Sequence, residues 1–356
     1  MTYGKTTTSA LRESNSFKIL NSLYKDGVKT RTELSKELHL SLPTVMRIVQ
    51  PYMNDLLLIK GKSRSTGGRR AEKILFNYSA RKIGGVQIEK DFFSIAVSNL
   101  NRSPLLVERI SFDCTSSSRV SEAVNEKLLE YVNSGKILSE ELQVLTIAVG
   151  GIIDEEARSI AADFPLNWKN VFYDNFFKPD FYETFPNCTV IFENDANALA
   201  VGEYVERKLT NESLIALYLG RGIGAGVIVN GKLWRGSHGR AGEIGKWIPI
   251  FNGRNETFET YFNRSQRSKK IEIILSMLND LAMLFDPSTI ILAGDINDIY
   301  EEISRNVRSF HGIKIEKSVK GELAVISGAL AISANKFIKK VAYKDYKYRY
   351  EVYKEA

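Results

Sequence analysis

The chain contains very little cysteine. Only Cys114 and Cys188 occur among 356 residues, and they form no CxxC spacing. A disulfide framework and a cysteine-ligated zinc site are therefore not expected. The scarcity of cysteine makes a cytoplasmic location the expected one. Apolar runs of about 18 residues are also absent, so no segment is expected to span a membrane. The segment 1–17 has no apolar core, and a secretory signal peptide is not expected either.

Negative charge is scarce in one part of the chain. Residues 1–80 contain 14 Lys/Arg and 6 Asp/Glu, a net charge of +8. The remaining residues contain 35 Lys/Arg and 36 Asp/Glu, a net charge of −1. A basic excess confined to one terminal segment is typical of a nucleic-acid-binding module attached to a neutral domain. A solvated basic face is the alternative, and the pattern inside the segment decides between them.

Three short helical patterns fill the first part of this segment. Apolar residues recur at helical spacing over 16–24. Thr30 and Glu33 form a capping box that opens a second helix, and Ser41 is a suitable N-cap for a third helix over about 43–57. Two helices joined by a short turn form a helix-turn-helix, whose second helix enters the major groove of DNA. The predicted contacts from that helix are Ser41, Thr44 and Arg47.

Two strand-like runs, 57–59 and 73–77, flank a basic loop over 60–70. This pattern predicts a β-hairpin wing, whose arginines can reach phosphates or a minor groove. A small helical protein-binding module is the alternative, but the wing and the charge of +8 favour DNA. We interpret residues 1–80 as a winged helix-turn-helix domain, with wing contacts from Arg64, Arg69 and Arg70.

From residue 81 onward strands alternate with helices, the signature of an α/β fold. The predicted strand over 189–192 ends at Glu193-Asn194-Asp195, where a helix over 196–207 begins. Because ligands of α/β sheets bind at the carboxyl ends of strands, Asn194 and Asp195 are placed for chemistry. The alternative is that Asp195 serves only as the N-cap of the helix.

Glycine is concentrated in one stretch, 219–245, which holds 9 of the 25 glycines. A buried strand over 214–219 leads into glycines that permit a close approach of the backbone. Asn230-Gly231 between apolar flanks then predicts a hairpin, and the stretch ends with Glu243 between small residues. This pattern indicates one lobe of a ligand cleft, and a hairpin that serves only the fold is the alternative.

These motifs, in this order, closely resemble the ROK family of repressors and sugar kinases. The resemblance implies an N-terminal winged helix-turn-helix followed by a two-lobed, actin-like ATPase (ribonuclease H-like) domain with a sugar cleft between the lobes. The expected domains are 1–80 for DNA binding, 81–198 for lobe 1 with 325–340 returning to it, 199–324 for lobe 2, and a basic, tyrosine-rich tail over 341–356. The motifs that carry the resemblance lie at 150–154, 167–171, 193–198, 219–245 and 290–295.

Departures from the family pattern concern the nucleotide and the metal. Gln87 to Asp91 stands where family kinases have a glycine-rich phosphate loop, and Arg221 replaces a threonine of the second loop. An acid and a long side chain replace the glycines whose backbone N–H groups would hold phosphate, and this disfavours nucleotide binding. The family's zinc motif aligns with 250–259, where its three cysteines are absent, and Lys246 replaces its histidine. We therefore expect neither ATP nor zinc as a cofactor.

The residues that resemble the family's sugar ligands are retained. Carboxylates that accept hydrogen bonds from hydroxyl groups suit a polyol. For Lys246 two interpretations stay open: it contacts an acidic or phosphorylated sugar, or it pairs with Glu243 or Glu259. The expected sugar-binding set is Asn194, Asp195, Glu243, Lys246, Glu259, Gly151 and Asn167.

The favoured function is a sugar-responsive repressor without catalytic activity. It would act as a homodimer or tetramer, with operator DNA and a small carbohydrate effector as partners. Two alternatives remain: an active sugar kinase with a DNA-binding appendage, and a regulator controlled by a protein partner.

Overall fold

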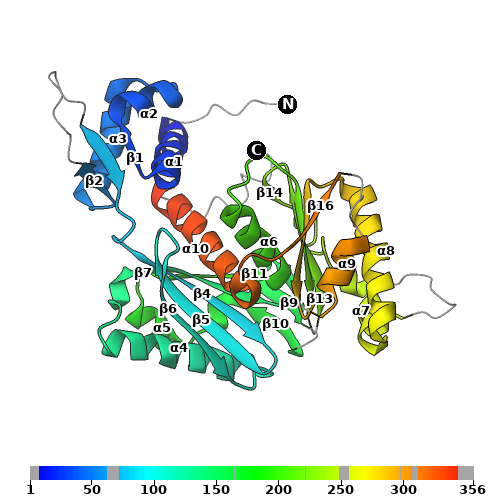
Figure 1. Cartoon of the computed structure of the whole chain (residues 1–356). Coiled ribbons are helices and arrows are strands. Elements are labelled where there is room, and N and C mark those ends of the chain that lie inside the picture. Colours follow the sequence, from blue (N-terminus) through cyan, green and yellow to red (C-terminus); the bar gives the residue numbers. More distant parts are fainter. Residues whose placement is uncertain are drawn as a thin grey trace, which may run out of the picture. The chain divides into compact units, whose positions relative to one another are not determined.

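The computed structural model describes residues 8–61, 72–163, 166–220, 222–247, 256–296, 298–306 and 312–343, without the side chains of 162–163. The chain divides into two compact units (Figure 1). The N-terminal unit contains Met1–Lys82, Asn99–Ser103 and Ala334–Ala356, and the α/β unit contains Ile83–Ser98 and Pro104–Ser333.

The N-terminal unit contains the predicted helices and wing strands. Thr30 and Glu33 form the predicted capping box, and Ser41 accepts a hydrogen bond from Thr44 N as the N-cap of the third helix. A short strand that the sequence pattern did not predict, β1, completes a sheet of order β1-β3-β2. The elements are α1 (Thr8–Asp26), β1 (Val28–Thr30), α2 (Arg31–Glu37), α3 (Leu42–Asn54), β2 (Leu58–Gly61) and β3 (Lys73–Phe76).

The end of the last helix, α10 (Ala324–Ala342), belongs to the N-terminal unit. Tyr343 stacks on Phe17 with the ring centroids 5.7 Å apart, and Tyr52 donates a hydrogen bond of 3.2 Å to Val341 O. The resemblance predicts that 325–340 returns to lobe 1, and within this range 325–333 belongs to the α/β unit and 334–340 to the N-terminal unit. The stretch Gly321–Ala342 is long and apolar enough to cross a membrane by length and composition, but 61% of its apolar window is buried, as in a core helix.

The first lobe of the α/β unit is a five-stranded sheet of order β11-β7-β4-β5-β6. The predicted hairpin is present as β4 and β5, and β11 runs parallel to β7. A small sheet of order β10-β9-β8 lies in the same lobe. The strands are β4 (Lys82–Glu89), β5 (Phe92–Asn99), β6 (Pro104–Ser111), β7 (Leu142–Val149), β8 (Ile152–Asp154), β9 (Ser159–Asp163), β10 (Trp168–Phe172) and β11 (Thr189–Asn194), and the helices are α4 (Ser117–Asn133) and α5 (Pro179–Thr184).

The second lobe is built on a sheet of order β14-β13-β12-β15-β16. Asn230 and Gly231 both have positive φ, 49° and 76°, so the predicted two-residue hairpin turn joins β13 to β14. The elements are β12 (Leu214–Leu219), β13 (Ile223–Val229), β14 (Lys232–Leu233), α7 (Phe258–Arg264), α8 (Arg267–Phe285), β15 (Thr289–Gly294), α9 (Tyr300–Asn306) and β16 (Lys314–Lys317).

Helices α6 (Asp195–Glu206) and α10 connect the two sheets. Ser333 of α10 donates a hydrogen bond of 2.8 Å to Gly84 O in the first sheet, and α6 packs on β12 and β13 of the second. The helices approach so closely that a Cβ on Gly328 would lie 1.7 Å from Ala198 O. Any side chain at Gly328 would force the two helices apart.

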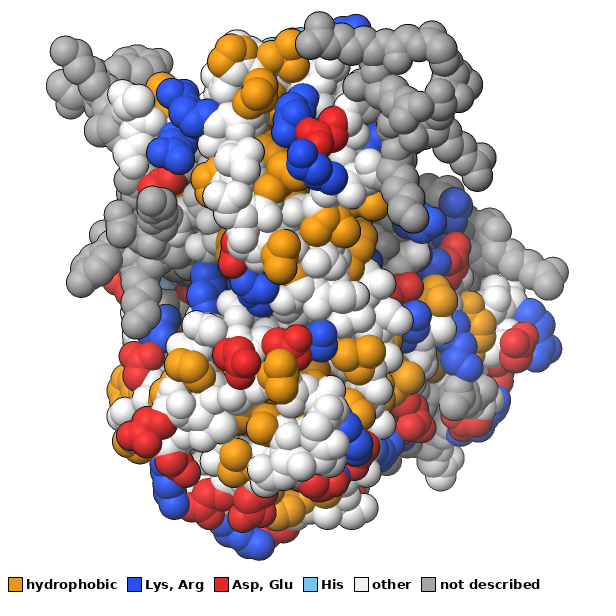
Figure 2. Space-filling view, turned by 90° about the vertical axis from the view of Figure 1, so that its left-hand side faces the viewer, with side chains coloured by type: hydrophobic (Ala, Val, Ile, Leu, Met, Phe, Trp, Pro, Cys, Tyr) orange, Lys and Arg blue, Asp and Glu red, His pale blue; other side chains and the backbone are white. Residues whose placement is uncertain are grey.

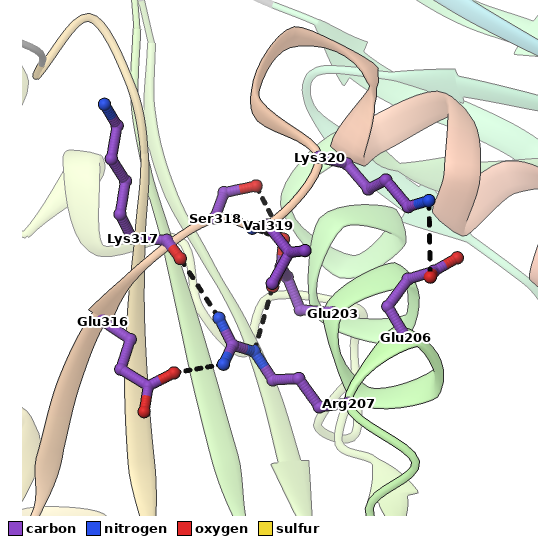
Figure 3. A network of polar contacts seen from close by, with 8 residues as sticks. All are labelled: Glu203, Glu206, Arg207, Glu316, Lys317, Ser318, Val319 and Lys320. Carbon is purple, nitrogen blue, oxygen red and sulfur yellow. Dashed lines mark hydrogen bonds and ion pairs between the residues drawn. The ribbon is translucent and has the colours of Figure 1, made fainter.

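A polar network fixes α6 to the second lobe (Figure 3). The Glu203 side chain is fully buried and accepts hydrogen bonds from Ser318 Oγ at 2.6 Å and from Val319 N at 3.0 Å. Arg207 pairs with Glu203 at 3.1 Å and with Glu316. Because a buried carboxylate is tolerated only when it is paired and hydrogen-bonded, these contacts hold the chain before α10 against α6.

Candidate functional site

The turn between β11 and α6 presents the predicted Asn194-Asp195 pair at the carboxyl end of a strand. Asn194 is the N-cap of α6: its Oδ1 accepts a hydrogen bond of 3.1 Å from Asn197 N, and its Nδ2 donates one of 3.1 Å to Gly151 O. The N-cap role considered for Asp195 therefore belongs to Asn194, because β11 extends to that residue. The Asn194 side chain holds the turn together rather than extending from it.

Asp195 is the first residue of α6 and is half-buried. Its Oδ1 accepts a hydrogen bond of 2.7 Å from Ala196 N. Burial raises the pKa of this carboxyl to about 6, and the negative charges of Glu243 and Glu259 act in the same direction. The charges of Glu243 and Glu259 reach Asp195 because the fold brings these carboxylates, from three distant parts of the chain, near one another.

The remaining members of the cluster come from the second lobe. Glu243 is half-buried, and burial raises its pKa, as does the charge of Glu259. Glu259 on α7 accepts a hydrogen bond of 3.1 Å from Ile223 N. Lys246 Nζ lies 3.7 Å from Glu259 Oε1, which is the second of the two predicted arrangements. The charges of Lys246 and Arg240 act on Glu243 in the opposite direction. The three carboxylates thus outnumber the two cations by one.

Two of the predicted residues lie apart from the cluster or serve the backbone. Gly151 contributes its carbonyl oxygen to Asn194, at a φ of 108° that glycine adopts readily. Asn167 is exposed, with a φ of 60°, directly before β10. Within the described ranges, no hydrogen bond or ion pair joins Asn167 to the carboxylates.

The sequence pattern did not single out Glu193 and its partner, Arg235. Glu193 is only 3% exposed, and its Oε1 accepts hydrogen bonds of 3.0 Å from Asn194 N and from Asn197 Nδ2. Its Oε2 pairs with Arg235, which also lies 3.2 Å from Glu155 Oε1. The pair joins the turn of the first lobe to the hairpin of the second. The sequence does contain one signal for this pair: Glu193 is an acid at the end of a buried strand, and a buried acid requires a cationic partner.

An internal hydrogen bond occupies the position at which family kinases have their first phosphate loop. Tyr218 on β12 donates a hydrogen bond of 3.1 Å to Glu89 Oε1 at the end of β4. Burial raises the pKa of Tyr218, as does the charge of Glu89, so the phenol remains a neutral donor. A carboxylate here opposes a phosphate by like charge. Arg221 and residues 250–255 of the aligned zinc motif lie outside the described residues.

A cavity of about 560 Å³ lies in the second lobe, at the ends of β12 and β15. Its lining includes Gly220, Lys270, Asp295 and Arg267, and the last of these pairs with Glu302 at 2.7 Å. Asp195, Glu243 and Glu259 are not among the residues that line it. The carboxylate cluster, where pKa values are displaced, is the better candidate for a binding site.

The predicted DNA-contacting residues lie on or beside α3. The Ser41 and Thr44 hydroxyls are 2.8 Å apart and bond to each other at the start of the helix. Arg47 and Gln50 are exposed, and Gln50 donates a hydrogen bond of 2.9 Å to Asn54. The wing arginines Arg64, Arg69 and Arg70 lie outside the described residues. Figure 2 shows acidic and basic side chains interspersed over the lower part of the face that it presents.

Both the N-terminal unit and the α/β unit contain residues that are similar to known protein families. Residues 83–258 match the ROK family model, and residues 12–55 match a winged helix-turn-helix DNA-binding model. The solved structure of a ROK family transcriptional regulator, a homologue of the E. coli MLC protein, superposes with a TM-score of 0.72 at 16% identity, covering 93% of this chain and 98% of that one. A ROK family glucokinase from Streptomyces griseus gives a TM-score of 0.52 at 20% identity over 71% of this chain and 99% of that one. The predicted fold class is confirmed.

Two xylose repressors and one dual regulator are among the curated relatives of this chain. The xylose repressor of Staphylococcus xylosus is 30% identical over 278 residues, which are 74% of this chain and 65% of that protein. The xylose repressor of Bacillus subtilis is 23% identical, covering 91% of this chain and 93% of the relative. The dual regulator NagC of Escherichia coli is 22% identical over 66% of this chain and 57% of its own length. The chain thus spans just under two thirds of the first of these relatives.

Proposed function

Since this chain carries a ROK family domain over residues 83–258 and a winged helix-turn-helix domain over residues 12–55, we propose that it is a sugar-responsive transcriptional repressor. It would act in the cytoplasm on operator DNA, as a homodimer or tetramer. The observation that carries the sugar part is the cluster of Asp195, Glu243 and Glu259, whose charges act on one another. The relatives named xylose repressors support the same assignment.

The chemistry of the cluster favours a neutral sugar over an acidic one. Each carboxylate can accept hydrogen bonds from sugar hydroxyl groups. Lys246 already lies 3.7 Å from Glu259, so its charge is partly neutralised inside the cluster. A phosphorylated or carboxylated sugar would then meet net negative charge, which opposes its binding. Sugar binding changes DNA binding only to the extent that the sugar prefers one conformation of the protein.

Calorimetry with a sugar panel tests this proposal. With D-xylose, D-glucose and N-acetyl-D-glucosamine as neutral probes and D-xylonate and glucose 6-phosphate as acidic ones, we expect at least one neutral sugar to bind at least about tenfold more tightly than either acid. Equal or tighter binding of an acid would reverse the charge argument. Binding of no sugar at all, by calorimetry or by thermal shift, would favour control by a protein partner.

One observation favours the second candidate, an active sugar kinase. A carboxyl with a pKa of about 6 is suited to act as a general base on a sugar hydroxyl near neutral pH. Against it stands the Glu89 carboxylate, hydrogen-bonded to Tyr218 where phosphate would have to lie. ATP turnover with the same neutral sugars distinguishes the two. Phosphorylation that Asp195→Asn abolishes would establish the kinase and remove our assignment of a non-catalytic domain.

The DNA-binding part of the proposal makes a prediction about Arg47. Its side chain is exposed in the second turn of α3, where residues of a recognition helix reach base edges. We expect Arg47→Ala to weaken binding to a preferred duplex about tenfold or more, since a base contact of this kind contributes about 1–3 kcal/mol. Fluorescence anisotropy measures this, with Arg305→Ala on α9 as a control of equal charge change. If both variants bind alike, α3 is not the reading helix.

A further inference from the structure

The start of α3 exposes large apolar side chains. Leu42 is 44% exposed and Met46 is 52% exposed. They are four residues apart, so they lie one above the other on the same face of the helix. The core contacts of α3 come from Val45, Ile48 and Val49, whose side chains are buried on the adjoining part of the helix surface. Leu42 and Met46 form the outer edge of this apolar surface, and about half of each side chain remains open to a partner.

The polar groups around this pair are largely occupied. Ser41 and Thr44 bond to each other at 2.8 Å, and Ser41 Oγ also accepts a hydrogen bond from Thr44 N. Pro43, between them, has no N–H group to donate. The first turn of α3 thus offers few hydrogen-bond donors to a base edge, and Arg47 is the exposed charged group next to Met46.

The partner of this face must be anionic overall and yet offer apolar groups. The net charge of +8 over residues 1–80 argues for DNA. Only thymine presents an apolar group, its C5 methyl, at the base edges in the major groove. Resting on the proposed function, we infer that Leu42 and Met46 read thymine through its methyl group, so that the preferred sequence has A·T pairs beneath the first two turns of α3. Arg47, beside them, donates hydrogen bonds to a neighbouring base edge.

Replacing thymine by uracil tests this inference, because it removes the methyl and keeps the base pair. The probe is a duplex that the full-length protein selects from a random 20-base-pair library, resynthesised with uracil at every thymine of the selected positions. We expect uracil to weaken binding about fourfold for each methyl contacted, which corresponds to about 0.8 kcal/mol. Met46→Ala should bind the thymine duplex more weakly and lose most of the discrimination against uracil.

Matched variants separate methyl reading from other effects. Gln50→Ala, one turn beyond Met46 on α3, should retain the full discrimination against uracil, and Leu42→Ala should lose part of it. Because both apolar side chains are about half exposed, the variants should lose little stability and unfold close to the temperature of the parent protein. Equal discrimination in the parent and in Met46→Ala would show that the methyls act through DNA shape, and would overturn the inference. No discrimination in the parent protein would overturn it too. If the full-length protein selects no duplex, the proposed function itself fails.

Discussion

Asp195→Asn should raise the free energy of unfolding of the sugar-free protein at pH 8. In the folded protein the pKa of Asp195 is about 6, against about 3.9 in an unfolded chain. The folded state therefore binds more protons between these values, and its stability falls as pH rises from about 4 to about 6. Above pH 6 the full cost of the charge is present. Asparagine removes that charge and can still accept the hydrogen bond from Ala196 N.

The expected gain is about 2–3 kcal/mol at pH 8 and close to zero near pH 4, from a pKa difference of about two units. Urea unfolding at the two pH values measures it. Asp113→Asn is the matched control, because its carboxylate also accepts a backbone hydrogen bond, from Thr115 N, but its pKa is lowered. This variant should lose a little stability at pH 8. A loss of stability in Asp195→Asn at pH 8 would show that the carboxylate is not held at a cost.

The same substitution should impair sugar binding, because a hydrogen bond to a charged acceptor contributes about 1.5–3 kcal/mol. We expect a loss of about tenfold to a hundredfold in affinity for the neutral sugar that calorimetry identifies. In the parent protein the affinity should also fall as the pH is lowered through 6, where Asp195 takes up its proton. An affinity that is constant between pH 5 and pH 8 would place the sugar elsewhere.

The local structure followed from the sequence because its signals are local. The capping box at Thr30, the N-cap at Ser41 and the turn at Asn230-Gly231 each involve residues within three positions of one another. Their hydrogen bonds form whenever the segment folds, whatever surrounds it. Strand β1 was missed because three residues carry no periodicity, and its pairing with β3 is non-local.

The site was predicted as a set of residue types but not as a set of contacts. The sequence pattern places Asn194 and Asp195 at the end of a strand. Which of the two holds the turn, and which remains available to a ligand, depends on where Gly151 lies after folding. Glu193 was overlooked because its partner Arg235 is 42 residues away. The distance of 3.7 Å between Lys246 and Glu259 depends on where α7 lies after folding, and a contact of Lys246 with a sugar stays a prediction. Such contacts join residues that are far apart in the chain, so they produce no periodic pattern in the sequence.

Arg235→Met should destabilise the protein by about 3 kcal/mol. Its partner Glu193 is 3% exposed, so removal of the guanidinium leaves a carboxylate buried without its counter-charge, which costs about 3–5 kcal/mol in comparable pairs. We place the loss at the lower end because the Arg235 side chain is 33% exposed and water can enter. Arg158→Met, which breaks a pair with the exposed Asp174, is the control and should change stability by less than about 1 kcal/mol.

A second substitution distinguishes an unpaired charge from lost packing. Glu193→Gln in the Arg235→Met background removes the charge, while its amide oxygen can still accept from Asn194 N and Asn197 Nδ2. We expect it to recover most of the lost stability in urea unfolding at pH 8, even though it is the second change at one site. Recovery occurs only if the cost lies in the buried charge. If the double variant is less stable than Arg235→Met, the cost of removing the arginine lies in the lost packing of its stem and not in an unpaired charge on Glu193.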